Sequence, residues 1–396
     1  MLNTVHPAEF PVYPRWSIRP ARAEGCLLWD EDGREYLDMY GGHAVTAVGH
    51  NHPRVVRAIR EQAEQLLFYS NVVPLAIREE LFDALAAEAP SGLRSAFLVN
   101  SGAEANEQAL ALARRLTGRA KIVSVEGGFH GRTIQTLAAA GTEKYREFAR
   151  IGGAGDALVE ATVCVPFDDV AALREAVNAE TAAVLFEPVQ GLAGARALSS
   201  EFLRVARERC DDTGAFLVFD EVQCGCGRTG AFTAAQAYDV TPDLLTLAKA
   251  LGSGLPIGAL LAGPSIVETL KNGDLGTTFG GGPVPAAAAV ATLGILADEE
   301  LPARALTLEH SLRTRLAPLA GIERIVGKGL LLGLELDRPA SPVLAALRAE
   351  GVLAGGAVAP NTLRLLPPLV LEESHVTRFA TALEKALAAT SNEVGA

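Results

Sequence analysis

Short apolar runs alternate with longer amphipathic stretches between residues 75 and 250, and this alternation constrains the fold more than any other feature of the chain. The expected helices include residues 76–89 and 102–118. The expected strands are residues 95–100, 120–125, 182–187, 215–220 and 244–249. Successive strand–helix–strand units place helices on both faces of a mostly parallel sheet. The sequence therefore predicts an α/β fold.

The two ends of the chain have a different character. Residues 28–40 predict a hairpin with Asp-Gly at its turn. Near the other end, a long helix near 284–318 is expected to precede the segment IVGKGLLLGLEL and a helix–strand–helix tail. We therefore expect three parts: an N-terminal segment (1–50) that packs with the small domain, a large domain (51–290) and a small C-terminal α+β domain (291–396).

Composition excludes several classes of protein. The formal net charge of −12, with no basic block, argues against a nucleic-acid partner. The longest apolar stretch, Pro285–Ala297, is shorter than the roughly 20 residues that a membrane span needs. No secretory signal is visible at the N-terminus, and an odd number of cysteines, five, indicates reduced thiols. We therefore expect a cytoplasmic protein.

The pair Cys224 and Cys226 raises the question of a metal site. Zinc sites usually draw four ligands from spaced pairs, and the other three cysteines form no second close pair. The spacing therefore favours small residues packed in a glycine-rich turn, and we expect no metal.

Polar residues follow three of the expected strands, where α/β proteins gather their ligands. Ser101, Gly102 and Ala103 open a helix and could bind a phosphate through backbone N–H groups, or could simply form an N-cap. Asp220 ends a second strand, where it could equally cap a helix or form a salt bridge. Lys249, one of only six lysines, ends a third. Burial would lower the pKa of Lys249 and make it a nucleophile, unless it pairs with an acid.

Together these groups match the needs of one cofactor, pyridoxal 5'-phosphate. That cofactor requires a lysine for its aldehyde, an acid at its ring nitrogen and a cradle for its phosphate. An ionised Asp220 would keep the ring nitrogen protonated, and the adjacent Glu221 is expected to be a structural neighbour. The glycines of GSGLPIG lack the spacing of a dinucleotide site.

Nine segments, in order, resemble the class III (ω-amino acid) aminotransferases across nearly the whole chain, and within them the acetylornithine aminotransferases most closely. These segments are YGGHAVTAVGHNHP, SGAEANEQALALAR, FHGRT, EPVQG, DEVQCGCGRTG, TLAKALGSGLPIGA, GTTFGG, GKGLLLGLEL and LRLLPPL. The resemblance implies a fold type I transferase that binds pyridoxal 5'-phosphate in its large domain, with a mostly parallel, seven-stranded-type sheet. It also implies a homodimer with shared active sites.

The resemblance carries roles to matching residues. Lys249 is the implied catalytic residue and binds the cofactor covalently. The other implied cofactor-binding residues are Ser101, Gly102 and Ala103 at the phosphate, Phe129 stacked on the ring, Asp220 at its nitrogen, Gln223 at its phenolic oxygen, and Thr278 from the partner subunit. The implied substrate-binding residues are Arg132, Thr277 and Arg364. His130 is assigned to packing, and His50 and His52 to turns or caps.

The same resemblance implies a reaction. The δ-amino group of N-acetyl-L-ornithine would pass to 2-oxoglutarate, giving N-acetyl-L-glutamate 5-semialdehyde and L-glutamate, as in arginine biosynthesis. N-succinylornithine, an α-acylated or carrier-linked lysine, free ornithine and 4-aminobutyrate stay open as donors. Another pyridoxal-phosphate activity, such as an aminomutase or a decarboxylase, and a non-catalytic binding protein of the same fold are the rivals from other classes.

Two positions depart from the family pattern. Leu192 stands where family members often carry Glu after EPVQG, and Gly282 stands where they carry Asn. A Glu at position 192 would pair with Arg364 and mask it until glutamate arrives, which Leu192 cannot do. We therefore expect Arg364 to accept glutamate readily, and we expect an acylated donor, since its blocked α-nitrogen cannot react. The Gly282 change is expected only to loosen a turn.

Overall fold

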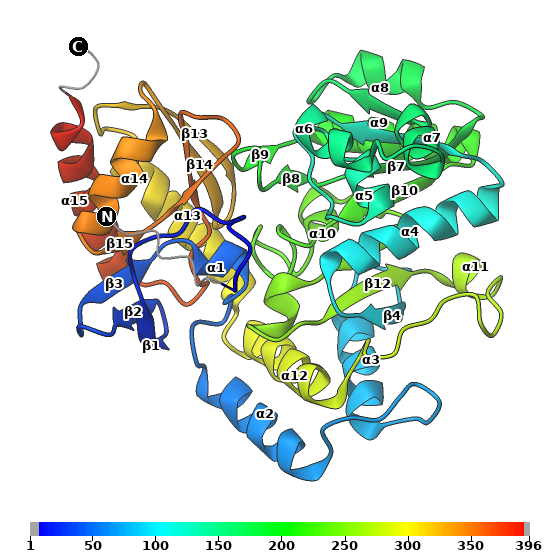
Figure 1. Cartoon of the computed structure of the whole chain (residues 1–396), viewed down its shortest axis with the longest axis horizontal. Coiled ribbons are helices and arrows are strands. Elements are labelled where there is room, and N and C mark those ends of the chain that lie inside the picture. Colours follow the sequence, from blue (N-terminus) through cyan, green and yellow to red (C-terminus); the bar gives the residue numbers. More distant parts are fainter. Residues whose placement is uncertain (1–7, 392–396) are drawn as a thin grey trace.

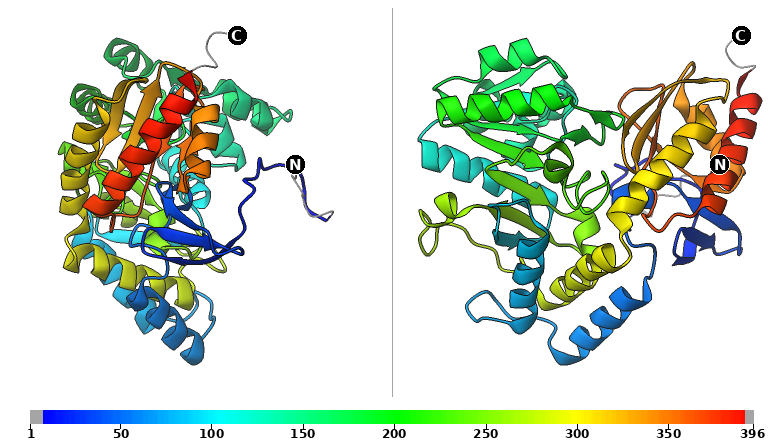
Figure 2. Two further views of the ribbon diagram at one scale, coloured as in Figure 1. Left: turned by 90° about the vertical axis from the view of Figure 1, so that its left-hand side faces the viewer. Right: turned by 180° about the vertical axis from the view of Figure 1, so that it is seen from behind.

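The computed structural model describes residues 8–391, which form two lobes joined by a pair of consecutive helices (Figure 1). The larger lobe contains a seven-stranded sheet with helices on both faces. The smaller lobe holds the C-terminal part of the chain, from α13 onward, together with the N-terminal strands, as the two further views show (Figure 2). No helix within residues 8–391 is long and apolar enough to cross a membrane.

The seven strands of the large sheet lie in the order β4-β12-β11-β10-β7-β5-β6. Their bounds are β4 Ser95–Val99, β5 Lys121–Val125, β6 Thr162–Val165, β7 Thr181–Phe186, β10 Phe216–Asp220, β11 Leu244–Leu247 and β12 Gly258–Ala262. All neighbours pair in parallel except around β12, which is antiparallel to both β11 and β4. The five predicted strands and the mostly parallel sheet are confirmed, whereas β6 and β12 were not anticipated.

Both faces of the sheet are buried, which explains why its strands are continuously apolar. Along β7, Ala183 and Leu185 pack on one face with residues of α4 (Gly102–Thr117). Phe186 faces the other way, where its ring lies 5.6 Å from that of Phe202 in α9 (Ser200–Thr213). The predicted helices at 76–89 and 102–118 are confirmed as α3 (Ala76–Glu88) and α4. Because β4 and β10 run in the same direction, Ser101 after β4 and Asp220 at the end of β10 lie at the same edge of the sheet.

The helix predicted near 284–318 is wrong, because two helices occupy this stretch. They are α12 (Pro283–Asp298) and α13 (Leu301–Leu316). Glu300 between them has φ 49°, a left-handed conformation that ends an α-helix. Pro302, at the second position of α13, fits the start of a helix and not its interior. α12 packs in the large lobe on α2 (Pro53–Gln65) and α3, whereas α13 lies in the small lobe (Figure 1).

The small lobe contains two four-stranded sheets. One has the order β13-β14-β17-β16, with bounds Ile322–Lys328, Leu331–Leu336, Thr362–Leu365 and Gly355–Gly356. The other has the order β1-β2-β3-β15, with bounds Pro20–Glu24, Leu27–Asp30, Glu35–Asp38 and Val352–Leu353. The predicted hairpin at 28–40 is confirmed as β2–β3. Because β15 pairs in parallel with β3, the two ends of the chain share one sheet.

The remaining elements are short, apart from two helices of the small lobe. The latter are α14 (Ala340–Ala349) and α15 (Glu373–Ala389). The short ones are α1 Gly41–Ala44, α5 Ile134–Ala138, α6 Glu143–Arg146, η1 Glu147–Ala149, α7 Ala154–Glu160, α8 Val170–Ala176, β8 Val189–Gln190, β9 Arg196–Ala197, α10 Ala234–Tyr238, η2 Lys249–Gly252 and α11 Pro264–Val267. The domain boundaries at residues 50 and 290 stay a prediction; the second falls inside α12.

Candidate active site

A cavity of about 650 Å³ lies where strands of the large sheet end and the small lobe faces them. It brings together nine of the eleven site residues expected from the sequence: Ser101, Gly102, Ala103, Phe129, Arg132, Asp220, Gln223, Lys249 and Arg364. The other two do not line it. Thr277 and Thr278 follow α11, where the Thr277 carbonyl accepts a hydrogen bond from Asn71 and Thr278 is exposed.

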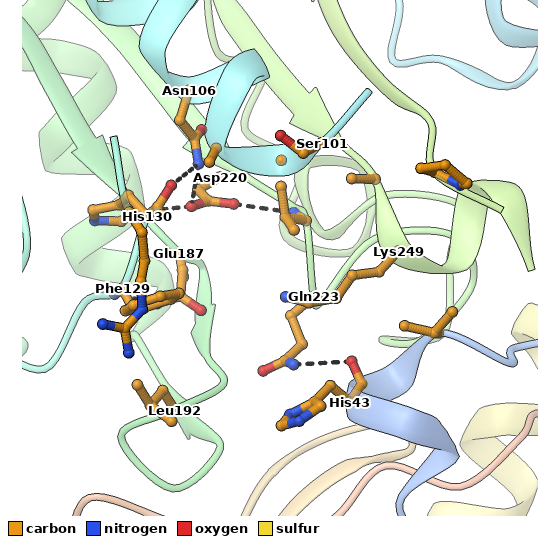
Figure 3. Close-up of a pocket in the computed structure, with 18 of the residues that line it drawn as sticks. His43, Ser101, Asn106, Phe129, His130, Glu187, Leu192, Asp220, Gln223 and Lys249 are labelled. Atoms are coloured by element: carbon orange, nitrogen blue, oxygen red, sulfur yellow. Dashed lines mark hydrogen bonds and ion pairs between the residues drawn. The ribbon is translucent and has the colours of Figure 1, made fainter. Parts of the chain in front are cut away.

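Asp220 is the most constrained group in the cavity. Its carboxylate is buried, with Oδ2 accepting a hydrogen bond from Asn106 Nδ2 at 2.7 Å and lying 2.8 Å from His130 Nδ1 (Figure 3). Oδ1 accepts the backbone N–H of Val222 at 3.1 Å. Asn106 is itself fixed, because its Oδ1 accepts a hydrogen bond from Thr246 at 2.8 Å. Three strand-end segments therefore orient one carboxylate.

Two members of this network were missed or misassigned from the sequence. Asn106 was not anticipated, because it lies one turn inside α4, beyond the helix start where the expected phosphate-binding residues are. His130 was assigned to packing alone, which is wrong, since it contacts Asp220. Its Nε2 is buried and has no hydrogen-bond partner among residues 8–391. The FHGRT motif was the available signal for His130, but sequence alone gave no partner for its ring.

Glu221 points away from the cavity, as expected of a structural neighbour. Its carboxylate accepts the backbone N–H groups of Ala234 and Ala235, which open α10. Burial raises the pKa of Glu221 to about 8, and the two hydrogen bonds only partly oppose that shift. The two adjacent carboxylates that close β10 therefore have separate tasks, one facing the cavity and one capping a helix.

Lys249 begins the 3-10 turn η2 and projects into the cavity (Figure 3). Within residues 8–391 the side-chain amine of Lys249 forms no ion pair and no hydrogen bond, so Lys249 is not the salt-bridged lysine of the alternative interpretation. Burial lowers the pKa of Lys249, while the nearby Asp220 and Glu187 oppose that shift. A lysine with these properties is suited to nucleophilic and acid–base chemistry.

The first turn of α4 offers a seat for an anion. Ser101 caps the helix by accepting the backbone N–H of Glu104 at 3.1 Å. The backbone N–H groups of Gly102 and Ala103 lie in the first turn of α4, where no carbonyl of the helix can accept a hydrogen bond from them. A Cβ at Gly102 would lie 2.5 Å from a Val222 methyl, so only glycine lets the turn approach β10 this closely. A phosphate fits this cradle.

Phe129 and Gln223 occupy the space between these groups. Phe129 lies edge-on to Tyr145, with ring centroids 5.1 Å apart, and lines the cavity. Gln223 donates through Nε2 to the His43 carbonyl at 3.1 Å (Figure 3). A phosphate seat, an aromatic face, a buried carboxylate and an unpaired lysine are the groups that pyridoxal 5'-phosphate requires, so the residues fit this cofactor.

Arg364, from β17, forms the opposite wall, and the alternative of a surface charge is wrong because the residue is buried. Its Nε donates to the Gly356 carbonyl at 2.6 Å and its Nη1 to the Gly191 carbonyl at 3.0 Å. Nη2 donates to Tyr40 Oη at 3.3 Å, and Tyr40 Oη lies 2.7 Å from His43 Nδ1. Burial lowers the pKa of Arg364. It forms no ion pair within residues 8–391, and Leu192 lines the same cavity.

Two further charged groups border the cavity. Arg132, an expected substrate ligand, lies over the Tyr145 ring, 5.0 Å from its centroid. Glu187 was not anticipated as a site residue. Its two oxygens accept the backbone N–H groups of Phe129 and Gly191, each at 2.9 Å, and burial raises its pKa to about 7. Glu187 thus ties together the segments that carry Phe129 and Leu192.

The cysteine pair lies behind the cavity. All five cysteines are free, and Cys224 and Cys226 are buried. Within residues 8–391, no group of three or more His, Cys, Asp or Glu side chains is arranged to hold a metal ion.

Comparisons with known proteins cover nearly the whole chain. The profile of the family described as aminotransferase class-III matches residues 12–387. The chain is 44% identical over 370 residues to an acetylornithine aminotransferase from Mycolicibacterium smegmatis, covering 92% of each chain. Among solved structures, N-acetylornithine aminotransferase from Stenotrophomonas maltophilia K279a has a TM-score of 0.81 at 34% identity, covering 95% of this chain and 97% of that one. Ornithine aminotransferase from Toxoplasma gondii ME49 has a TM-score of 0.89 at 31% identity, covering 97% and 93%.

Proposed function

Because this chain belongs to the class-III aminotransferase family, we propose that it moves the δ-amino group of N-acetyl-L-ornithine to 2-oxoglutarate. The products would be N-acetyl-L-glutamate 5-semialdehyde and L-glutamate, as in arginine biosynthesis. Aminotransferases of this class depend on pyridoxal 5'-phosphate, and so does this enzyme. The observation that carries the choice of donor is the shared identity of 38 to 44% with relatives named acetylornithine aminotransferase, over at least 92% of this chain.

The bound cofactor supplies an electron sink that stabilises negative charge at the substrate carbon. We propose that Lys249 holds its aldehyde carbon and that Asp220 keeps its ring nitrogen protonated, with Asn106 and His130 fixing the carboxylate. Phe129 would stack on the ring and Gln223 would face its phenolic oxygen. The phosphate would lie at the start of α4, against Ser101, Gly102 and Ala103.

Lys249 has a second task in this proposal. With its pKa lowered by burial, it is suited to take the proton from the substrate carbon and to return it at the neighbouring carbon of the cofactor. Arg364 and Arg132, which line the cavity, would bind substrate carboxylates through their planar guanidinium groups.

The nature of the opposite wall supports an acylated donor. Since Leu192 offers no carboxylate, the donors of Arg364 are held by backbone carbonyls and by Tyr40. A free diamino acid could therefore enter through either amino group, whereas an N-acylated ornithine has only its δ-amine available. N-Succinylornithine fits the same argument, because no residue that we assign reads the acyl group. Ornithine is the second candidate, favoured by the likeness to the Toxoplasma gondii enzyme.

The decisive experiment measures specificity constants side by side on the purified protein. The donors are N-acetylornithine, N-succinylornithine, ornithine and 4-aminobutyrate, each with 2-oxoglutarate as acceptor. We expect an acylated ornithine to be preferred. A preference of tenfold or more for free ornithine or 4-aminobutyrate, about 1.4 kcal/mol in transition-state binding, would overturn the proposed donor.

We also propose that the enzyme is a homodimer whose subunits share active sites. Large apolar side chains are exposed together in the segment 66–73 and at Phe279, including Leu67, Val72 and Phe279 at 69%, 81% and 64% exposure. The rings of Phe68 and Phe279 lie 5.1 Å apart, so these residues form one surface beside Thr278. A patch of this kind marks a protein interface, and a second copy would cover it. Thr278 would then contact the partner's phosphate.

A heterodimer tests this arrangement. One chain carries Thr278→Ala with Lys249 intact, and the other carries Lys249→Ala with Thr278 intact. The only lysine-bearing site then receives an intact threonine from the partner chain, and we expect it to hold phosphate as tightly as the wild-type site. Affinity equal to that of the Thr278→Ala homodimer would contradict a shared site.

Two further parts of the proposal concern location and organisation. We propose a cytoplasmic enzyme, which is supported by five free cysteines, four of them buried. We also propose that residues 51–290 form the cofactor-binding domain and residues 291–396 the small domain. Limited proteolysis and a fusion with a compartment reporter would check these two points separately.

A further inference from the structure

Arg228 is the largest fully buried side chain among residues 8–391. It is 1% exposed and follows β10 in the turn that also carries Val222 and Gln223. Its Nη1 donates to the carbonyl of Leu330 at 3.1 Å and to that of Pro367 at 2.5 Å. Nη2 is buried and has no partner among residues 8–391. Burial lowers the pKa of Arg228 to about 10.

No carboxylate forms an ion pair with this guanidinium within residues 8–391. Burying a cation without a counter-ion is costly, and an apolar side chain of similar length would avoid the cost. Packing alone therefore does not explain an arginine here. Its hydrogen bonds do, because Leu330 and Pro367 lie outside the strands, where no strand partner reaches their carbonyls.

Both carbonyls belong to the small lobe, whereas Arg228 belongs to the large one. Leu330 is at the tip of the β13–β14 hairpin, and its own N–H donates to the Arg228 carbonyl at 2.9 Å. A Cβ at Gly329 would lie 2.2 Å from that same carbonyl, so the tip and the turn are in close contact. Arg228 therefore joins the two lobes through both its side chain and its backbone carbonyl.

The joined segments are the ones that face each other across the cavity. Pro367 lies three residues beyond Arg364, just after β17. Gln223 lies five residues before Arg228, and Asp220 closes the strand before the turn. Arg228 thus bonds directly to the segment that carries the substrate-binding arginine and is covalently part of the segment that carries the cofactor-facing residues.

We propose that Arg228 is a positioning residue that sets the distance of Arg364 from the cofactor side of the cavity. It touches neither substrate nor cofactor and acts through Arg364. This rests on the proposed binding of a substrate carboxylate by Arg364. Loss of the Arg228 side chain lets the segment 366–367 shift relative to the turn after β10. Arg364 then meets the substrate carboxylate in a poorer geometry, while the cofactor-binding residues keep their positions.

A double-mutant cycle with Arg364 tests the proposal. The cofactor-loaded enzyme is titrated calorimetrically with glutarate, a non-reacting dicarboxylate, and the glutamate half-reaction is followed in parallel. We expect Arg228→Met to weaken glutarate binding, and kcat/KM for glutamate, by about tenfold. In an Arg364→Gln background the same change should alter either quantity by less than twofold. Arg228→Lys keeps the charge and one donor nitrogen. With Arg364 intact, it should therefore recover part of the lost glutarate affinity.

Arg304→Met is the matched control. Arg304 also donates to backbone carbonyls of the small lobe, those of Val370 and Leu371, but from α13 within that lobe. We expect its loss to be additive with Arg364→Gln. Additive effects of Arg228→Met and Arg364→Gln, or unchanged glutarate binding in Arg228→Met, would overturn the proposal. If Arg228→Met does not fold, Arg228→Lys carries the cycle.

Failure of the proposed function has a different signature. A wild-type enzyme that loads the cofactor but does not bind glutarate would contradict the 2-oxoglutarate site itself. Cofactor absorbance of each variant, measured before titration, separates loss of cofactor from loss of carboxylate binding. Arg228→Met with reduced cofactor content would place Arg228 in cofactor binding and overturn its assignment to Arg364.

Discussion

The two walls of the cavity hold their charged groups in different ways. On the sheet wall, Asp220 is fixed by the side chains of Asn106 and His130. On the opposite wall, Arg364 is fixed mainly by backbone carbonyls, those of Gly191 and Gly356. The position of Asp220 therefore depends on the identity of two side chains. The position of Arg364 depends instead on the conformation of the backbone segments that carry Gly191 and Gly356.

This difference assigns separate tasks to the walls. A group that must stay in one protonation state throughout a reaction benefits from fixed side-chain partners. A group that must accept two substrates in turn benefits from partners that can adjust. We therefore expect changes on the sheet wall to abolish chemistry, and changes on the opposite wall to redistribute preference between substrates.

The largest expected effect is that of Lys249→Ala on the sheet wall. Turnover of N-acetylornithine with 2-oxoglutarate should fall by about 10³-fold or more, because both the nucleophile and the proton-transfer group are lost. Borohydride should bleach the visible absorbance band of the wild type and leave the cofactor attached to Lys249 through a stable C–N bond, and it should attach no cofactor in the variant. Lys385→Ala, at an exposed position of α15, is the control and should retain wild-type turnover. Wild-type turnover in Lys249→Ala would refute the assignment.

Asp220→Asn should have the next largest effect, with its neighbour Glu221→Gln as the matched control. Loss of the charge at the ring nitrogen should lower kcat by about 10²-fold, which is the usual size of a lost preorganised electrostatic contact. Glu221→Gln changes the adjacent carboxylate, which caps α10, and should lower kcat by less than about threefold. Equal losses in the two variants would contradict the separate tasks of these residues.

Leu192→Glu changes the opposite wall and should shift preference more than rate. The new carboxylate would pair with Arg364, so kcat/KM in the glutamate half-reaction should fall by about tenfold, as for one charge-assisted hydrogen bond. The N-acetylornithine half-reaction should change less. Leu192→Gln provides a control of similar size without charge. An unchanged glutamate half-reaction would show that no such gate can form in this protein.

The last prediction concerns stability and not turnover. It is that Glu221→Gln changes how the free energy of unfolding depends on pH. The pKa of Glu221 is raised from 4.5 to about 8 on folding, so the folded state binds this proton more tightly than the unfolded chain. Its contribution to stability is therefore full below pH 4.5 and is lost as pH rises toward 8. Glu221→Gln should remove up to about 1.4 kcal/mol per pH unit from that slope.

Chemical unfolding of both proteins at several pH values between 4.5 and 8 would measure this difference. The comparison concerns the slope with pH and not the free energy of unfolding at one pH, since the substitution also changes a helix cap. Parallel curves for the two proteins would mean that Glu221 titrates in the folded state as it does in the unfolded chain.

The sequence could predict the sheet wall because its signals are local. Apolar runs identify the strands, and a polar residue at a strand end must lie at the sheet edge, which is how Asp220 and Lys249 were found. Strand β12 was missed because GALLA is short and follows glycines and a proline that suggest only a loop. The break between α12 and α13 had a signal, Pro302, that a continuous helical pattern concealed.

The partners on both walls could not be predicted, because each depends on segments that are remote in sequence. Asn106 and His130 meet Asp220 only when helix α4, the segment after β5 and the end of β10 converge. Tyr40 reaches Arg364 across more than three hundred residues. Arg228 looks like a charge in a glycine-rich turn, and nothing in its neighbourhood in the sequence indicates that its acceptors lie near residues 330 and 367.

The pairing of β15 with β3 bears on how the chain is made. Leu37 and Val352 are partners, yet the ribosome synthesises them more than three hundred residues apart. At about 5 to 20 residues per second, the first strands wait roughly 15 to 60 s for the segment that completes their sheet. During that interval β3 has an open edge, of the kind that pairs with other chains. A strand that is translated late therefore protects the edge of a strand that is translated early.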